Sequence, residues 1–173
     1  EKEAIDFCYR QKKLDPQGKV LSNRGGWHSD FFNVTDDNII SNILTEGLGK
    51  SIFTAFHPSL GFSICYWIMI NCPSSYNASH THPDAHFSGV LWLKVPENSG
   101  KIKFDSPYEH TGHVETLSYL DEVKDQTAFY HSMTFSPKVG KMLTFPSALR
   151  HEVLLNESDE DRIAISYNIN ILK

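Results

Sequence analysis

The sequence predicts a mainly β protein, a sandwich or jelly roll preceded by one or two helices. Apolar residues follow helical spacing only in the first third of the chain, and after Gly61 they form about seven short, strand-like segments separated by turn residues. Such patterns are typical of closed or stacked antiparallel sheets. With 173 residues, 40% of them hydrophobic, we expect one domain over residues 1–173, with a helical part at about 1–60 and a jelly-roll core at about 61–173.

Two segments have the spacing of amphipathic helices. The first, residues 4–13, places apolar side chains three and four positions apart, at Ile5, Cys8 and Tyr9. Thr35 or Asp36 can cap the second, which should end near Gly47 or Gly49. Its apolar stripe consists of Ile39, Ile40, Ile43 and Leu44.

The strands are predicted from alternation and from β-branched and aromatic content. We expect them at residues 62–71, 87–95, 101–104, 128–135, 141–145, 151–156 and 162–172. The Gly-rich and then aromatic segment 22–32 is expected to be a loop or edge strand, and the part around Trp27 a plausible substrate wall. The polar stretch 105–127 is expected to be a long loop that serves as a lid or substrate wall. In the last strand, one core-facing side is formed by Ile163, Ile165, Tyr167, Ile169 and Ile171.

Composition narrows the class of function. The formal charge of -5 gives no basic footprint, so no nucleic-acid partner is expected. Cys8, Cys65 and Cys72 form no CxxC pair, which favours free thiols in a reducing cytoplasm. No run of about 18 apolar residues predicts a membrane span, and no signal-peptide pattern opens the chain. An edge strand or the N-terminal helices would be the natural surfaces for a homodimer.

Histidines cluster in residues 76–96, which run YNASHTHPDAHFSGVLWLKVP. His80, His82, Asp84 and His86 are each two positions apart, and alternate residues of an extended chain project to the same face. A His at the end of a strand with a second ligand two residues later is half of a mononuclear metal site.

The other half of such a site must come from a distant strand. His151, in FPSALRHEV, is the best candidate. Imidazole and carboxylate ligands suit Fe(II) held on one face, which leaves positions open for a co-substrate and O₂. Arg162 begins the last strand, and its guanidinium can bind a carboxylate through two parallel hydrogen bonds. The residues thus predict a non-haem iron site backed by an anion-binding arginine.

Each of these residues also has a purely structural explanation. An HxH pair is often part of a polar surface loop, and Arg162 alone would be a surface charge. We assign His86 to the surface and expect His28, beside Trp27, to be structural. The metal interpretation is favoured because the HxH pair, His151 and the arginine occur together, in that order, on predicted strands.

Several segments taken together resemble a known family. The order Y-N-x-x-H-x-H-P, SGVLWLKVP, ENSGKIKFDSP, VGKMLTFPSALRHEV and RIAISYNI resembles the 2-oxoglutarate/Fe(II)-dependent oxygenases, especially small ones of bacteria and bacteriophages. SNRGGWHS near residue 22 resembles their N-terminal signature. The resemblance covers roughly residues 20–170 and implies a cupin-like double-stranded β-helix, Fe(II), 2-oxoglutarate and O₂. In it, His151 matches the distal iron ligand, and Arg162 matches the residue that pairs with the far carboxylate of 2-oxoglutarate.

Two sets of metal ligands compete within this resemblance. His82 and Asp84 spell the H-x-D of the wider superfamily, whereas His80 and His82 stand where the narrower pattern has H-x-H. We favour His80, His82 and His151, because Phe87 opens the next strand only three residues after Asp84. Asp84 then remains the alternative carboxylate ligand or a supporting partner.

The co-substrate pocket is predicted from the same resemblance. Ala164 stands where the pattern has a serine, and Ser166, on the strand face of Arg162, is expected to supply that hydroxyl. Tyr76 and Asn77, just before the ligands, are expected to line the pocket.

The favoured function is therefore a dioxygenase, a hydroxylase that uses O₂ and releases succinate and CO₂. Its substrate would be a small molecule or a protein side chain, which the sequence does not specify. One alternative is a three-histidine cupin-type dioxygenase without 2-oxoglutarate, in which Arg162 would bind the substrate's carboxylate. The other is a non-catalytic jelly-roll binding module.

Overall fold

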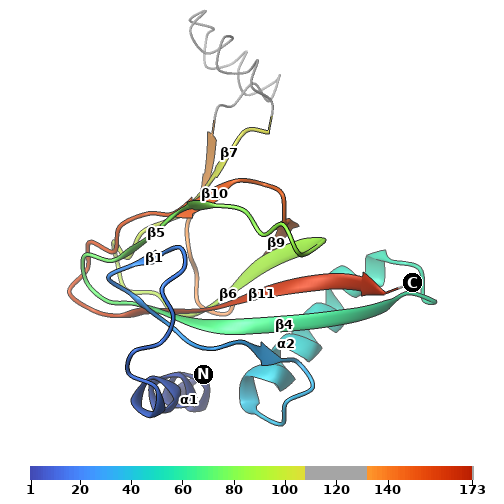
Figure 1. Cartoon of the computed structure of the whole chain (residues 1–173), viewed down its shortest axis with the longest axis horizontal. Helices are drawn as coiled ribbons and strands as arrows, with labels where there is room; N and C mark the ends of the chain where they lie inside the picture. Colours follow the sequence, from blue (N-terminus) through green and yellow to red (C-terminus); the bar gives the residue numbers. More distant parts are fainter. Residues whose placement is uncertain (108–131, 173) are drawn as a thin grey trace, which may run out of the picture.

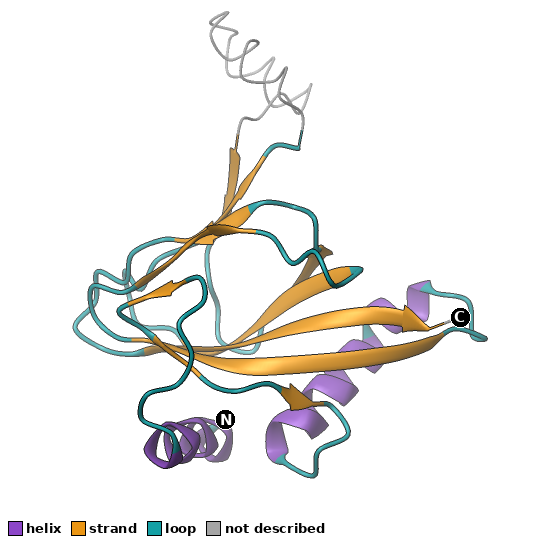
Figure 2. Ribbon diagram, viewed as in Figure 1, coloured by secondary structure: helices purple, strands orange, loops and turns teal. Residues whose placement is uncertain are grey.

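The computed structural model describes residues 1–107 and 132–172, which form two antiparallel sheets and two α-helices (Figure 1, Figure 2). The smaller sheet has the order β1 (Asn23–Arg24), β5 (Tyr76–His80), β10 (His151–Val153), β7 (Ile102–Asp105) and β8 (Ser132–Phe135). The larger has the order β2 (Trp27–His28), β4 (Gly61–Asn71), β11 (Arg162–Leu172), β6 (Phe87–Lys94) and β9 (Met142–Pro146), with β3 (Phe32–Asn33) also on β4. The predicted mainly β fold with N-terminal helices is confirmed.

Strand β11 shows how alternation produces a core on one face of the large sheet and a cavity on the other. It pairs with β4 along its whole length and with β6 on its other edge. Side chains on one face are buried in a cluster with the helices, namely Ile163, Ile165, Tyr167 and Ile169. Side chains on the opposite face line a cavity between the two sheets, namely Arg162, Ala164, Ser166 and Asn168.

The helices cover the outer face of the large sheet (Figure 2). They are α1 (Lys2–Leu14) and α2 (Ile39–Lys50), and a 3-10 turn, η1 (Ile52–Ala55), follows α2. Ala4 and Cys8 of α1 and Ile40, Leu44 and Leu48 of α2 are buried in the same cluster as the outward side chains of β4 and β11. Burial of these apolar stripes is what holds helices of this length in place.

The predicted start of α2 was wrong. Its N-cap is Asn38, whose side-chain oxygen accepts hydrogen bonds from the backbone N–H groups of Ile40 and Ser41, both at 3.0 Å. Asp36 instead closes the preceding turn, because its carboxylate accepts from the backbone N–H of Asn33 at 2.9 Å. An asparagine and an aspartate are equally good caps, so the sequence alone did not distinguish them.

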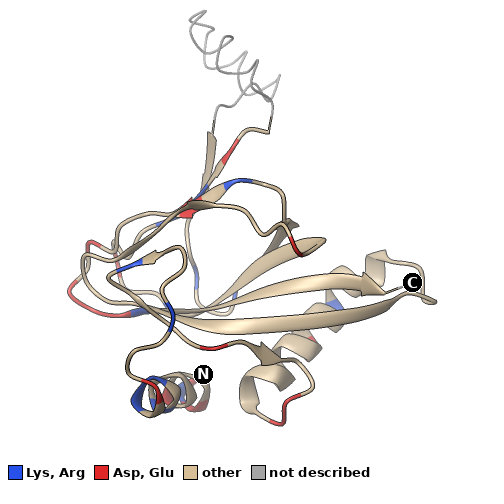
Figure 3. Cartoon of the chain, viewed as in Figure 1, with Lys and Arg blue, Asp and Glu red and all other residues tan. Residues whose placement is uncertain are grey.

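Charged side chains lie mainly on the loops, the helices and the smaller sheet, and β4 and β11 carry almost none (Figure 3). The large sheet is therefore covered on both faces, by helices on one side and by the smaller sheet on the other. Among the described residues, no helix is both long enough and apolar enough to cross a bilayer.

Three predicted segments either lie largely outside the described residues or end at a different residue in the structure. The loop expected at 105–127 and the strand expected at 128–135 fall largely outside the described residues, which resume at Ser132, where β8 begins.

Strand β10 ends at Val153, not at residue 156 as predicted. The reason is Asn156, which is fully buried and whose side-chain N–H₂ donates to the backbone carbonyls of Asn71 and Glu160 at 2.9 and 2.8 Å. These bonds hold the chain in a turn.

The glycine-containing segment after residue 21 connects the edges of the two sheets. β1 lies at the edge of the small sheet against β5, and β2 lies at the edge of the large sheet against β4. The prediction of a loop or edge strand here is confirmed. The segment passes from one sheet to the other, so it forms an end wall of the space between them.

Candidate metal centre

A cavity of about 590 Å³ lies between the two sheets. Strands of both sheets contribute to its walls, together with the segment before β1 and the turn after β5. Every residue proposed from sequence as a metal or co-substrate ligand lines it, except Tyr76. Those residues are Asn77, His80, His82, Asp84, His151, Arg162 and Ser166.

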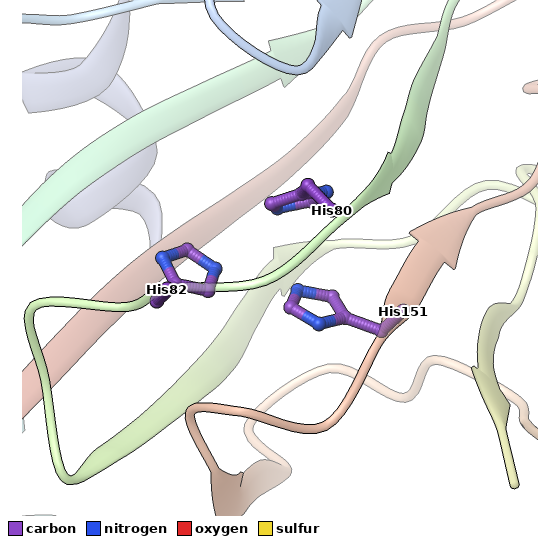
Figure 4. A group of neighbouring side chains, drawn as sticks. All are labelled: His80, His82 and His151. Atoms are coloured by element: carbon purple, nitrogen blue, oxygen red, sulfur yellow. The ribbon is translucent and has the colours of Figure 1, made fainter. Parts of the chain in front are cut away.

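Three histidines converge in this cavity (Figure 4). One ring nitrogen from each of His80, His82 and His151 lies within 4.8 Å of the others. His80 and His151 are cross-strand partners on β5 and β10, with ring centroids 4.3 Å apart. The His82 centroid lies 5.0 Å from that of His80 and 5.2 Å from that of His151. Three imidazoles at this separation can bind one metal ion.

Backbone hydrogen bonds determine which nitrogen is free to bind metal. The Nδ1 atom of His80 lies 2.7 Å from the backbone oxygen of Ala78, and that of His151 lies 2.9 Å from the oxygen of Leu149. A carbonyl oxygen only accepts, so Nδ1 carries the proton in both rings and Nε2 carries the lone pair. This outer hydrogen bond is the usual way in which proteins orient a metal-binding histidine.

Burial also keeps the rings in the neutral form that binds metal. The pKa of His82 is lowered to about 3, first by desolvation and then by the neighbouring histidines. Desolvation likewise lowers the pKa of His151, to about 4, and that of His80. At neutral pH the three side chains therefore present lone pairs, as Fe(II) requires.

The competing ligand Asp84 is placed differently. It lines the cavity but is exposed, and within the described residues it does not belong to the group of converging ligand atoms. His86 also lies outside this group, and its Nδ1 is 3.1 Å from the side-chain oxygen of Asn170. Tyr76 is 41% exposed and does not line the cavity, so the structure does not bring it to the site.

Arg162 is a buried cation at another part of the cavity wall. It is 2% exposed, and its Nη1 donates to the backbone oxygens of Ser99 and Gly100 at 2.6 and 3.2 Å. Burial lowers its pKa to about 10, so it remains charged at neutral pH. No carboxylate among the described residues forms an ion pair with it. A buried guanidinium with free donors and no counter-charge is suited to an anionic ligand.

One wall of the same cavity is aromatic; Trp67 was not predicted to line it, and His28, which was expected to be structural, does line it. This wall consists of Trp67 on β4, His28 on β2 and Phe31 in the following loop, all of which line the cavity. The strand at 62–71 was predicted from its alternation, and Trp67 lies on the face opposite the core residues Tyr66 and Ile68. The pairing of Arg162 with Asn71 and of Ser166 with Trp67 places this second face beside the cavity.

Comparison with known proteins agrees with the geometry. A family model described as "Putative 2OG-Fe(II) oxygenase" matches residues 65–168, more than half of the chain. No curated protein sequence matches.

Solved structures share the fold. A prolyl-4-hydroxylase from Pseudomonas putida has a TM-score of 0.65 at 15% identity, over 97% of this chain and 84% of its own. An oxidoreductase of the 2OG-Fe(II) oxygenase family from Burkholderia pseudomallei has a TM-score of 0.56 at 16% identity, over 94% and 77%. A prolyl hydroxylase from Trichoplax adhaerens, in complex with a hypoxia inducible factor peptide fragment, has 0.60 at 13%, over 98% and 77%.

The residues present fit the two groups that this family requires. Three neutral imidazoles within reach of one another fit Fe(II). A buried arginine that has no carboxylate partner in the described part of the chain fits the free carboxylate of 2-oxoglutarate. The family implies both cofactors and an enzymatic role. From the matched segment, the two-sheet fold and this donor set, we conclude that the chain belongs to the 2OG-Fe(II) oxygenase family.

Proposed function

We propose that this protein is a hydroxylase that binds Fe(II) through His80, His82 and His151 and binds the far carboxylate of 2-oxoglutarate through Arg162. The observation that carries the proposal is that the histidine group and the buried arginine line one cavity. These residues come from β5, the turn after it, β10 and β11. Within the described residues no carboxylate pairs with the buried Arg162 guanidinium, and an anionic ligand would offset the cost of burying that charge.

The chain's own residues orient and desolvate the reactants. With 2-oxoglutarate and O₂, bound iron supplies the oxidising chemistry, with succinate and CO₂ as co-products. His80, His82 and His151 would hold the ion at the cavity wall, where the co-substrate could reach it. Arg162 fixes one end of the co-substrate, and Ser166 and Asn77 offer further hydrogen bonds beside it. Val90, Trp92, Ile102 and Phe145 supply apolar walls that limit water.

The substrate is proposed to be a protein side chain or a small molecule. Two of the structures with the same fold are prolyl hydroxylases, one of them in complex with a peptide fragment. Leu21 and Phe31, 53% and 47% exposed, lie at the cavity wall and give its mouth an apolar rim. Exposed apolar side chains at a cavity mouth favour an organic substrate with apolar surface.

The decisive experiment is an anaerobic titration of the Fe(II) protein with 2-oxoglutarate, followed by visible absorption. Chelation of the iron by 2-oxoglutarate should give a metal-to-ligand charge-transfer band that saturates. Arg162→Gln should require much more 2-oxoglutarate to saturate the band. If no band develops although iron is bound, the proposed use of 2-oxoglutarate is wrong.

A three-histidine dioxygenase without 2-oxoglutarate is the second candidate. It is favoured by the converging ligand group itself, which contains no carboxylate among the described residues. In that case Arg162 would bind a carboxylate of the substrate. Succinate formation coupled to loss of 2-oxoglutarate supports the first candidate. Consumption of O₂ with a carboxylate substrate and no 2-oxoglutarate would support the second.

A further inference from the structure

A fourth histidine lines the cavity without joining the metal group. His28 is 2% exposed and lies on β2, which pairs with β4 through the partners Trp27–Ile70 and His28–Met69. Trp27 is packed into the core under the helices, so its neighbour His28 points to the opposite side, into the cavity. Among the described residues, the converging ligand group contains the other three histidines and leaves His28 out.

The His28 ring has one nitrogen in use and one free. Its Nδ1 lies 2.6 Å from the backbone oxygen of Ser29, so this nitrogen carries the proton and Nε2 carries a lone pair. No hydrogen-bond partner of Nε2 occurs in the parts of the chain that the structure describes. In those parts, Ser99 Oγ is the only side-chain polar atom that is shielded from solvent and also lacks a hydrogen-bond partner. The unpartnered Nε2 of His28 is therefore not shielded. The Nε2 atom of His28 is therefore open to the cavity as a hydrogen-bond acceptor.

Aromatic rings hold this acceptor in place and connect it to the metal group. The His28 ring stacks on Trp67 with centroids 5.6 Å apart and an interplanar angle of 8°. Phe31 packs edge-on against both, at 5.8 Å from His28 and 5.4 Å from Trp67. The centroid of Trp67 lies 5.6 Å from that of His82. A molecule lying on this wall is next to a proposed iron ligand.

We propose that the Nε2 of His28 accepts a hydrogen bond from an N–H or O–H group of the substrate, whose apolar part packs on Trp67 and Phe31. That the bound molecule is a substrate rests on the proposed function. The preference of this subsite for a hydrogen-bond donor does not. The cavity then has two chemically opposite subsites. Arg162 offers hydrogen-bond donors to an anion, and His28 offers a lone pair, which an anion would avoid. The second subsite selects a neutral group with a donor, an amide or a hydroxyl, beside a flat or aliphatic surface.

The test uses Zn(II)-loaded protein, which is diamagnetic, and two probes that differ in one donor. Benzyl alcohol has an aromatic ring and an O–H, and benzyl methyl ether has the same ring with the O–H methylated. Both are titrated by NMR, following the ¹⁵N resonances of the histidine rings. We expect benzyl alcohol to bind more tightly by about two- to tenfold, the range of one net hydrogen bond. The Nε2 resonance of His28 should shift with the alcohol and not with the ether.

Three variants separate the acceptor from the ring. His28→Phe keeps a flat ring against Trp67 but has no lone pair, so it should bind the two probes equally. His28→Gln restores an acceptor and should recover part of the preference. His86→Phe, a histidine outside the cavity, should leave the preference unchanged. Thermal unfolding of each variant checks that it is folded.

Three results would overturn the inference. They are equal binding of the two probes to the wild-type protein, a preference that survives in His28→Phe, and binding that leaves the His28 resonance unmoved. The last is visible in the wild-type protein and does not depend on any variant folding. Binding of 2-oxoglutarate to the same Zn(II) protein is measured separately. If it fails while the probe preference holds, the proposed function is wrong and the subsite stands.

Discussion

His80 and His151 are direct partners across β5 and β10, and their imidazole centroids lie 4.3 Å apart. Both donate Nδ1–H to the backbone oxygen two residues earlier, Ala78 and Leu149. The two strands thus present their histidines in the same tautomer and toward the same point. His82 completes the group from the turn after β5.

The choice between the two ligand sets can be decided by a pair of alanine variants. His80→Ala should lower Fe(II) affinity by more than the roughly 10- to 100-fold that loss of a supporting residue costs, because it removes a direct ligand. Asp84→Ala should change affinity little, since this exposed carboxylate lies outside the converging group. Calorimetric titration under anaerobic conditions measures both. The reverse order of effects would establish Asp84 as the ligand.

The contribution of Arg162 is tested by its affinity for the co-substrate. Arg162→Gln keeps a polar side chain but removes the charge, so the dissociation constant of 2-oxoglutarate should rise about 10- to 150-fold, as for loss of charged hydrogen bonds. Ser166→Ala, on the same strand face, removes a neutral hydroxyl and should cost only about two- to tenfold. The saturation point of the charge-transfer band gives both constants. Equal effects would mean that the charge of Arg162 is not what binds the ligand.

Gly100 should be required for the turn that holds Arg162. Its φ is +87°, and a Cβ there would lie 2.3 Å from the backbone oxygen of Leu154. Gly140 has a similar φ of +76° but open space around it. Gly140→Ala should therefore cost about 1–2 kcal/mol of unfolding free energy from backbone strain alone. Gly100→Ala should cost clearly more, because the clash adds to the strain.

Urea unfolding curves of the two glycine variants measure this difference directly. Gly100→Ala should also weaken 2-oxoglutarate binding, since the backbone oxygens of Ser99 and Gly100 accept from Arg162 Nη1. Equal stability losses in the two variants would show that the turn can shift to admit a methyl group.

Alkaline pH should destabilise the protein through Tyr167. Burial raises its pKa to about 12 from 10.0, so the folded state holds the phenol proton more tightly than the unfolded chain does. The stabilisation is complete below pH 10 and is lost as the pH rises from about 10 to 12, and two pKa units correspond to about 2–3 kcal/mol. Tyr167→Phe should flatten this part of a stability–pH profile measured by urea unfolding. An unchanged slope would assign the alkaline loss to other groups, such as Cys8, whose pKa burial also raises to about 12.

Much of the fold follows from local pattern. The change from helical to alternating spacing near Gly61 predicts helices first and strands afterwards, and both are observed. The alternation in β11 predicts which of its side chains are core, because strand geometry leaves only two faces. The predicted N-cap of α2 and the predicted end of β10 were wrong. Both boundaries are set by hydrogen bonds between an asparagine side chain, Asn38 or Asn156, and particular backbone groups.

The sequence by itself determined the candidate ligands, since an HxH pair on an extended chain projects its two imidazoles to one side, and the parity of β11 puts Arg162 and Ser166 on one face. Only the tertiary structure decided that His151 meets His80, because this depends on cross-strand register. It also placed Asp84, in the turn after β5, outside the group of described ligand atoms. It also decided that Trp67 and His28 share the cavity. Their sequence pattern is that of ordinary core residues, and the distinction arises from which face of the large sheet the second sheet covers.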